Sequence, residues 1–202
     1  METRNASVVD SLMNNTYPLQ RLDANKKIPL TLIKENWQFL CVRKYMLLHA
    51  EKLVGFPIAE KFEEAVRDRI PEVFSFLRSV ATKRLRSVDL ELQHQHLNYI
   101  PALAAYFEED CNVIFKTFEV NKSLHEVQNE APVTPFIAGI GNPYQLDPVC
   151  TVFVEKTPLE PMIALNDAIH TWFSSFYILN LVYPEECCAT LEYVMDFNIW
   201  CQ

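Results

Sequence analysis

The sequence has little glycine and none of the common phosphate-binding or nucleophile motifs. Only three of its 202 residues are glycine, whereas a phosphate-cradling loop needs several for tight turns and close backbone approach. The stretch IAGIGNP (137–143) has glycine but no lysine. No G-x-x-x-x-G-K-[ST], G-x-G-x-x-G, G-x-S-x-G or H-E-x-x-H pattern occurs. Nucleotide binding and the enzyme classes that carry these motifs are therefore disfavoured.

The sequence also lacks cysteines at the C-x-x-C spacing of many zinc and redox sites. Its six cysteines lie at positions 41, 111, 150, 187, 188 and 201, a pattern typical of reduced, mostly buried thiols inside a cell. The start, METRNASVVDSL, has no apolar core of a secretory signal. We therefore expect an intracellular protein, cytoplasmic or nuclear, whose sequons at Asn5, Asn14 and Asn121 carry no glycan.

No apolar run is long enough to cross a membrane. The most apolar segment, AIHTWFSSFYILNLVY (168–183), contains His170 and Asn180 and is shorter than the roughly 20 residues that a span needs. It predicts a buried core helix and no membrane association. Its aromatic residues Trp172, Phe173, Phe176 and Tyr177 recur at helical spacing, which favours core packing over a ligand pocket or a protein interface.

Acidic residues outnumber basic residues, so the formal net charge is −8. A dedicated nucleic-acid binder usually shows a basic excess. The one concentrated basic segment is ATKRLRS (81–87), with Lys83, Arg84 and Arg86. It is interpreted as a solvated connector, with phosphate contact as the alternative. Because 50% of the residues are hydrophobic and only 22% are charged, the chain has the material for a folded core.

Hydrophobic periodicity predicts helices, then a small sheet, then helices. Residues 1–28 are polar and without period, so they predict a flexible leader. Helical spacing covers 32–54, 59–79 with a kink or break at Pro71, and both sides of Pro101 as far as residue 118. Strands are predicted at 133–140 and 148–155, paired antiparallel across a short loop. Further helices are predicted at 162–181 and from Pro184 onward.

This order predicts an α+β fold that is mainly helical. It has a small antiparallel sheet of two strands, or a larger one, between N-terminal and C-terminal helices. Residues 29–202 are expected to form one globular domain, with a subdivision near 120–132 as the alternative.

The stretch LQHQHLNYIPALAAYFEEDC (92–111) collects polar residues that resemble a site. His94 and His96 point about 200° apart on a helix, so a shared metal with Glu108, Glu109 and Asp110 is disfavoured. Cys111 paired with His94, His125 or His170 is the nucleophile hypothesis. However, Cys111 falls on the apolar repeat of its helix, which favours a core position.

Four stretches also resemble a known family. LIKENWQFLCVRKYMLLHAEKLVG, IPALAAYFEED, TPFIAGIGNPYQLDPVCTVFVE and FSSFYILNLVYPEECCATLEYV are similar, in this order, to the C-terminal region of sterile alpha motif domain-containing protein 3 and related uncharacterised vertebrate proteins, abundant in fish. The resemblance covers about residues 30–200 and omits the sterile alpha motif domain itself. It implies no catalytic residues and carries a suggested link to mobile elements. Because the shared motif includes Glu109 and Asp110 rather than the histidines, we expect these two acidic residues to form structural hydrogen bonds.

The leading hypothesis is a non-enzymatic intracellular protein-interaction module without a cofactor or metal. A nucleic-acid-associated accessory protein derived from a mobile element is the first alternative, and it would use Lys83, Arg84 and Arg86. A cysteine- or metal-dependent enzyme is the second alternative.

Overall fold

The computed structural model describes residues 3–80, 83, 85–88, 90, 95–141, 149–162 and 164–199. The α-helices are α1 (Thr3–Asn15), α2 (Tyr17–Asn25), α3 (Leu30–Asn36), α4 (Arg43–Val54), α5 (Ile58–Ser79), α6 (Gln95–Tyr106), α7 (Leu124–Glu130), α8 (Leu165–Ile178) and α9 (Cys188–Ile199). Short 3₁₀ turns are η1 (Gln38–Cys41), η2 (Leu85–Ser87), η4 (Cys111–Val113) and η5 (Glu185–Cys187). The strands are β1 (Phe115–Phe118), β2 (Phe136–Ile140), β3 (Val149–Val154) and β4 (Thr157–Met162). The fold is α+β and mainly helical, as predicted.

The described strands form one mixed sheet in the order β1-β2-β3-β4. The two predicted strands correspond to β2 and β3, and their antiparallel pairing is confirmed. The sheet is larger than this pair, because β1 joins β2 in parallel and β4 joins β3 antiparallel. The prediction that helical spacing continues to residue 118 is wrong for β1. Glu108 has a positive φ of 62°, and this left-handed conformation takes the chain out of α6 before the strand begins.

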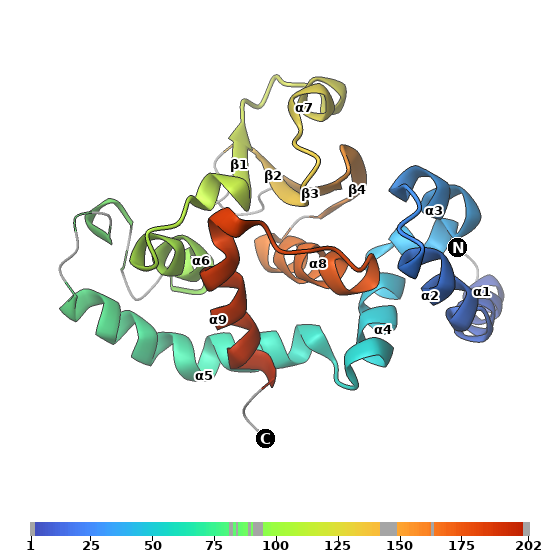
Figure 1. Ribbon diagram of the computed structural model, residues 1–202, viewed down its shortest axis with the longest axis horizontal. Coiled ribbons are helices and arrows are strands. Elements are labelled where there is room, and N and C mark those ends of the chain that lie inside the picture. The colour runs from blue at the N-terminus through green and yellow to red at the C-terminus, as the bar shows by residue number, and fades with distance from the viewer. Residues whose placement is uncertain are drawn as a thin grey trace.

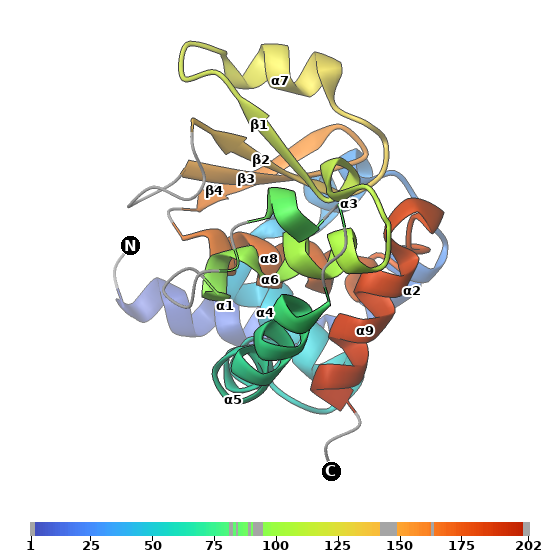
Figure 2. The same cartoon turned by 90° about the vertical axis from the view of Figure 1, so that its left-hand side faces the viewer.

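Helices cover both faces of the sheet. On one face, α7 packs Val127 and Ala131 against Phe136, Ala138 and Phe153, where the two phenylalanine rings stack at 5.2 Å. On the other face, α8 packs on β2 and β3 within the main hydrophobic core. Figure 2 shows the sheet between α7 and the layer that contains α8 and α6. Alternate residues of β2 and β3 therefore belong to two separate apolar clusters.

Helix α8 is the central element of the molecule. Its side chains are apolar around most of its circumference, which predicts burial on all sides, and Trp172 and Phe173 are buried. The indole Nε1 of Trp172 donates to the carbonyl oxygen of Pro135 at 2.9 Å. The helix begins at Leu165 rather than at the predicted residue 162, because Thr157–Met162 forms β4. This strand contains Pro158 and Pro161, which suit the edge of a sheet.

The first 28 residues differ from the predicted leader. Thr3–Asn25 forms the helices α1 and α2, which lie beside α3 and α4 at the right of Figure 1. Pro18 sits in the first turn of α2, where its missing N–H costs nothing. Ala24 is buried, and the guanidinium of Arg21 donates to the carbonyl oxygens of Tyr177 and Ile178 at 3.2 and 2.7 Å. Helix α2 thus closes the C-terminal end of α8.

Two acidic residues of the β3–β4 hairpin hold the starts of α3 and α4. The Glu155 carboxylate accepts from the backbone N–H of Leu30 at 2.7 Å, and the Glu160 carboxylate accepts from that of Arg43 at 2.8 Å. The first N–H groups of a helix have no partner within the helix, and a negative charge is favourable at this end. These bonds fix the starts of α3 and α4 against the β3–β4 hairpin.

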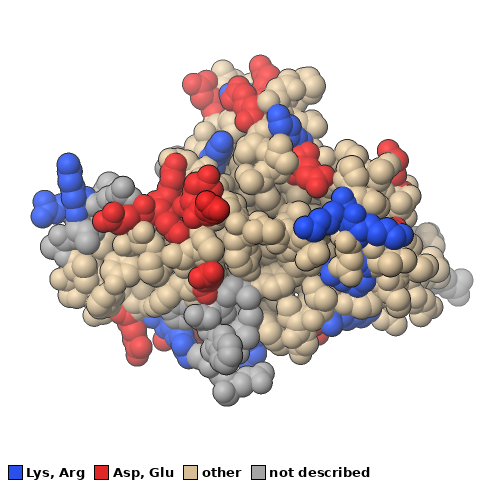
Figure 3. Space-filling view, in the orientation of Figure 1, with Lys and Arg blue, Asp and Glu red and all other residues tan. Residues whose placement is uncertain are grey.

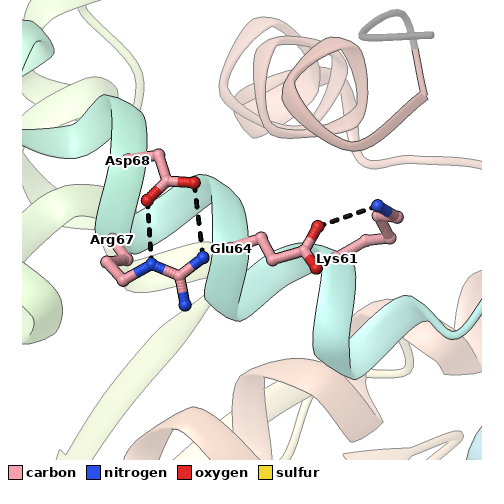
Figure 4. A network of polar contacts seen from close by, with 4 residues as sticks. All are labelled: Lys61, Glu64, Arg67 and Asp68. Carbon is pink, nitrogen blue, oxygen red and sulfur yellow. Dashed lines mark hydrogen bonds and ion pairs between the residues drawn. The ribbon is translucent and has the colours of Figure 1, made fainter.

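Helix α5 runs along the lower edge of the molecule in Figure 1. It is one helix of 22 residues that includes Pro71, so it is not broken into two short helices. Its outer face carries the pairs Lys61–Glu64 and Arg67–Asp68, both at 2.8 Å (Figure 4). These side chains are 43–68% exposed, and such ion pairs contribute little to stability.

Among the described residues, no helix is long and apolar enough to cross a membrane.

Candidate functional site

Glu109 and Asp110 form structural hydrogen bonds, as expected. The two carboxylate oxygens of Glu109 accept from the backbone N–H groups of Ala189 and Thr190, at 2.7 and 2.9 Å. Asp110 accepts from the N–H of Asn112 at 3.0 Å and starts the turn η4. Glu109 therefore caps α9 from a segment eighty residues away and takes the place of a local N-cap side chain.

The histidine part of the metal hypothesis falls largely outside the described residues. His94 and the side chain of His96 are not among them. Within the described part of the chain, no group of three or more His, Cys, Asp or Glu side chains is placed to hold a metal ion.

The candidate nucleophile Cys111 is held in its protonated form. Burial, and secondarily the nearby Asp110 carboxylate, raises the pKa of the Cys111 thiol to about 12. Of its proposed partners, His125 is exposed on α7, whereas His170 is buried with its ring 5.1 Å from that of Phe62. A thiol with a raised pKa is a weak nucleophile at neutral pH.

The aromatic residues of α8 are core residues. Trp172, Phe173 and Phe176 are 1–3% exposed, so their side chains do not reach the surface. Their burial does not support the alternative that these three residues form a protein interface. Tyr177 is partly exposed, and its hydroxyl accepts from that of Tyr183 at 3.1 Å.

In the basic segment 81–87, Lys83 and Arg86 are exposed, and Arg84 lies outside the described residues.

The structure reveals a cavity, lined by both polar and apolar residues, that the sequence did not predict. It has a volume of about 210 Å³ and lies between α1, α2 and α4. Its lining comes from all three helices: Asp10, Met13, Asn14, Tyr17, Gln20, Tyr45, Leu48, His49 and Lys52. We refer to it as the N-terminal cavity.

Gln20 and His49 form the buried part of this cavity. Gln20 Nε2 donates to the Met13 carbonyl at 3.1 Å and to Thr16 Oγ1 at 2.8 Å. Its Oε1 therefore faces His49 Nδ1 at 3.0 Å, and Nδ1 carries the proton. Burial, helped by the charges of Arg21 and Lys52, lowers the pKa of His49 to about 4. The ring is neutral at pH 7, and its buried Nε2 has no hydrogen-bond partner among the described residues.

Charged residues surround the mouth of the N-terminal cavity. The Asp10 carboxylate accepts from Lys44 Nζ at 2.5 Å and from the Tyr45 hydroxyl at 2.9 Å. Lys52 Nζ donates to Asn14 Oδ1 and lies 5.1 Å from the centroid of the Tyr17 ring. Lys44, which pairs with Asp10, does not line the cavity. Lys52 does, and it has no carboxylate partner among the described residues.

The helices around the cavity differ in charge from the rest of the protein. Residues 1–54 contain eight Lys or Arg and five Asp or Glu, a formal charge of +3, whereas residues 55–202 contain ten and twenty-one, a formal charge of −11. On the face shown in Figure 3, Lys and Arg gather over the N-terminal helices at the right, and Asp and Glu lie mainly elsewhere. The same helices expose several large apolar side chains at 37–57%, namely Val8, Leu12, Leu19, Leu22, Leu48 and Leu53.

Weak sequence signals pointed to this region. Val8 and Leu12, and Val9 and Met13, are spaced i, i+4, and Thr16 precedes Tyr17-Pro18 as a helix start would. The helical period was not detected because many polar residues lie between these apolar positions. His49 lies within the predicted helix 32–54, but nothing local distinguishes it from a surface histidine.

Comparison of the chain with protein-family models, with curated proteins and with solved structures found no match. The family resemblance of the sequence motifs therefore stays a prediction.

Proposed function

We propose that this protein is a non-enzymatic protein-binding module of the cytoplasm or nucleus. In this proposal, α1, α2 and α4 contact an acidic partner segment that carries apolar side chains. The observation that carries the proposal is that exposed leucine and valine side chains coincide with a local charge of +3 in an otherwise acidic protein. Exposed apolar residues within a charged surface are typical of protein-interaction sites, and opposite charge accelerates and orients association.

The state of the cysteines supports binding rather than catalysis. Burial raises the pKa of Cys41 and Cys150 to about 11 and that of Cys187 to about 12. These thiols, like that of Cys111, stay protonated at neutral pH and are poor nucleophiles. Their free, protonated state fits a reducing compartment.

The proposal is tested with two matched surface variants. The first combines Leu12→Ser with Leu19→Ser on α1 and α2. The control combines Val120→Ser with Val182→Ser, because these valines are 79% and 81% exposed far from the N-terminal helices in the sequence. Both should change the free energy of unfolding by less than about 0.5 kcal/mol per site.

Proximity labelling in cells that express the protein identifies partners of the wild type and of both variants. Binding to each purified partner is then measured by calorimetry at two salt concentrations. We expect the leucine variant to bind about tenfold or more weakly, the control to match the wild type, and higher salt to weaken binding. Equal affinities of both variants for every partner would contradict the proposal.

The alternative partner is nucleic acid. The exposed Lys83 and Arg86, together with the basic N-terminal helices, are the features that favour it. Fluorescence anisotropy with single-stranded and double-stranded DNA and RNA at low salt tests it directly, because phosphate contacts strengthen as salt falls. Binding that weakens steeply with salt, and weakens further in a Lys83→Gln/Arg86→Gln variant, would favour this alternative.

A further inference from the structure

The N-terminal cavity has the size of a small-molecule site. Its volume of about 210 Å³ is larger than that of an engineered protein cavity of about 150 Å³ that binds benzene. Asp10, Asn14, Leu48 and Lys52 all line it and are all exposed residues. The cavity therefore reaches the surface, and a small solute can enter from solvent.

The groups at its mouth favour an anion. Lys52 Nζ gives one of its three protons to Asn14 Oδ1, so the other two protons remain for further acceptors. Because Asn14 Oδ1 accepts this bond, Asn14 Nδ2 lies beside the ammonium, and it donates to no described residue. The one carboxylate of the lining, Asp10, is already bound by Lys44 and Tyr45. An ammonium and an amide N–H₂ group together match a ligand carboxylate.

The remaining lining favours an apolar or aromatic body on that carboxylate. The Tyr17 ring, Met13 and Leu48 present carbon and sulfur surface to the cavity. The Tyr17 ring is held in place, because it packs on the His49 ring at a centroid distance of 4.6 Å. His49 is in turn fixed by its hydrogen bond to the buried Gln20. A wall that is ordered before binding loses little entropy when a ligand binds.

We propose that the N-terminal cavity binds a small organic carboxylate, with its carboxylate on Lys52 and Asn14 and its apolar body against Tyr17, Met13 and Leu48. This site lies between the helices of the partner surface proposed above and shares Leu48 with it, but its ligand is a small molecule and its test requires no protein partner. A neutral ligand of the same shape would lose the bond to the ammonium, and a cationic ligand would be repelled by it.

The test uses three probes of nearly equal shape with the full-length protein, namely benzoate, benzamide and benzylammonium. Calorimetry and protein NMR measure their dissociation constants at pH 7. We expect benzoate to bind about tenfold or more tightly than benzamide, and benzylammonium to bind more weakly still. Lys52→Gln should weaken benzoate binding to the level of benzamide. The matched control Lys26→Gln changes an exposed lysine outside the cavity lining and should leave the affinity unchanged.

A second readout works in the wild-type protein and locates the bound probe. A carboxylate in this cavity adds negative charge near His49, and this charge favours the imidazolium form. Saturating benzoate should therefore raise the pKa of His49 from about 4, as measured by NMR titration of the imidazole signals, whereas benzamide should not. Equal binding of benzoate and benzamide, an unaffected Lys52→Gln variant, or a His49 pKa that benzoate leaves unchanged would each overturn the proposal.

Discussion

Glu109 connects two parts of the chain through a pair of charge-assisted hydrogen bonds. Its carboxylate accepts from two of the first backbone N–H groups of α9, and these groups have no other partner within that helix. Glu109→Ala leaves both donors without their acceptor. We expect it to lower the free energy of unfolding by about 1–2 kcal/mol, as the loss of a helix cap does, in urea titrations followed by circular dichroism.

Glu119→Ala is the matched control for this change. Glu119 is also an acidic residue, but it is exposed in the connection that follows β1, so its removal should change the free energy of unfolding by less than about 0.5 kcal/mol. If Glu109→Ala were no more destabilising than Glu119→Ala, the cap would have no energetic role.

The two buried histidines make stability depend on pH. Burial lowers the pKa of His49 and of His170 to about 4, from an ordinary value of 6.5. Between these values the unfolded chain binds more protons than the folded protein, so the free energy of unfolding rises with pH. The contribution is present above about pH 6.5 and is lost as the pH falls toward 4. Each histidine adds at most about 1.4 kcal/mol per pH unit to this slope.

His49→Gln tests this dependence in urea titrations between pH 4.5 and 6.5. The glutamine cannot be protonated, so the slope of unfolding free energy against pH should decrease relative to the wild type. Leu48→Ala, one residue away, should lower the stability at every pH and keep the slope. A His49→Gln variant with the wild-type slope would show that His49 is protonated equally in the folded and unfolded states.

Helices α1 and α8 represent opposite extremes of burial. No residue from Asn5 to Asn15 in α1 is buried, whereas most of α8 is. A helix of 13 residues is marginal without tertiary packing, and α1 is held to α4 chiefly through Asp10 and Asn14. We expect its amide hydrogens to exchange at least about a hundredfold faster than those of α8.

Hydrogen exchange followed by mass spectrometry measures this difference. Asp10→Asn, which removes the charge that pairs with Lys44, should speed exchange in α1 further and leave α8 unchanged. Asp68→Asn is the control, because Asp68 pairs with its own neighbour Arg67 on the exposed face of α5. Equal protection of α1 and α8 in the wild type would contradict the picture of a loosely held α1.

The elements that were predicted correctly are those in which the spacing of apolar residues along the sequence matches the residues that are buried. Helices α4 and α8 and strands β2 and β3 have clear periods or β-branched runs. Strand β1 was missed because Phe115 and Phe118 also fit a helical repeat, and the left-handed turn at Glu108 has no glycine to signal it. Strand β4 was missed because its two prolines, Pro158 and Pro161, are typical of a loop, although an edge strand tolerates them.

The candidate site was less predictable than the fold, because it depends on long-range contacts. The Glu109 cap was expected as a hydrogen-bonding element, but its partners on α9 are eighty residues away. The N-terminal cavity combines α4, which was predicted, with α1 and α2, which were not. A buried Gln20–His49 pair has no signature in the sequence, since each residue type is most often exposed.

At the scale of the whole molecule, the N-terminal helices are joined to the C-terminal half. Arg21 donates to the last carbonyl groups of α8, and the Asp23 carboxylate accepts from the indole of Trp37 at 3.0 Å. The Arg21 bonds span more than 150 residues and attach α2 to α8, whereas the Asp23 bond attaches α2 to the segment that follows α3. The positive charge of these helices also lies against a negatively charged remainder, which favours their attachment.

Deletion of residues 1–28 decides whether this segment is structural or a leader. Without it, the buried His49 and Tyr45 lose their hydrogen-bond partners Gln20 and Asp10, and the carbonyl groups of Tyr177 and Ile178 lose their cationic donor. We expect the deletion to lower the free energy of unfolding by about 3 kcal/mol or more, and Arg21→Ala alone to lower it by about 1–2 kcal/mol. Thermal and urea unfolding of both variants measure these losses.

A deletion variant with the melting temperature of the full chain would restore the leader interpretation, because the helices would then contribute no stability to the rest. A melting temperature reduced by the deletion and, by a smaller amount, by Arg21→Ala would instead show that the N-terminal helices, and with them the cavity, belong to the folded domain.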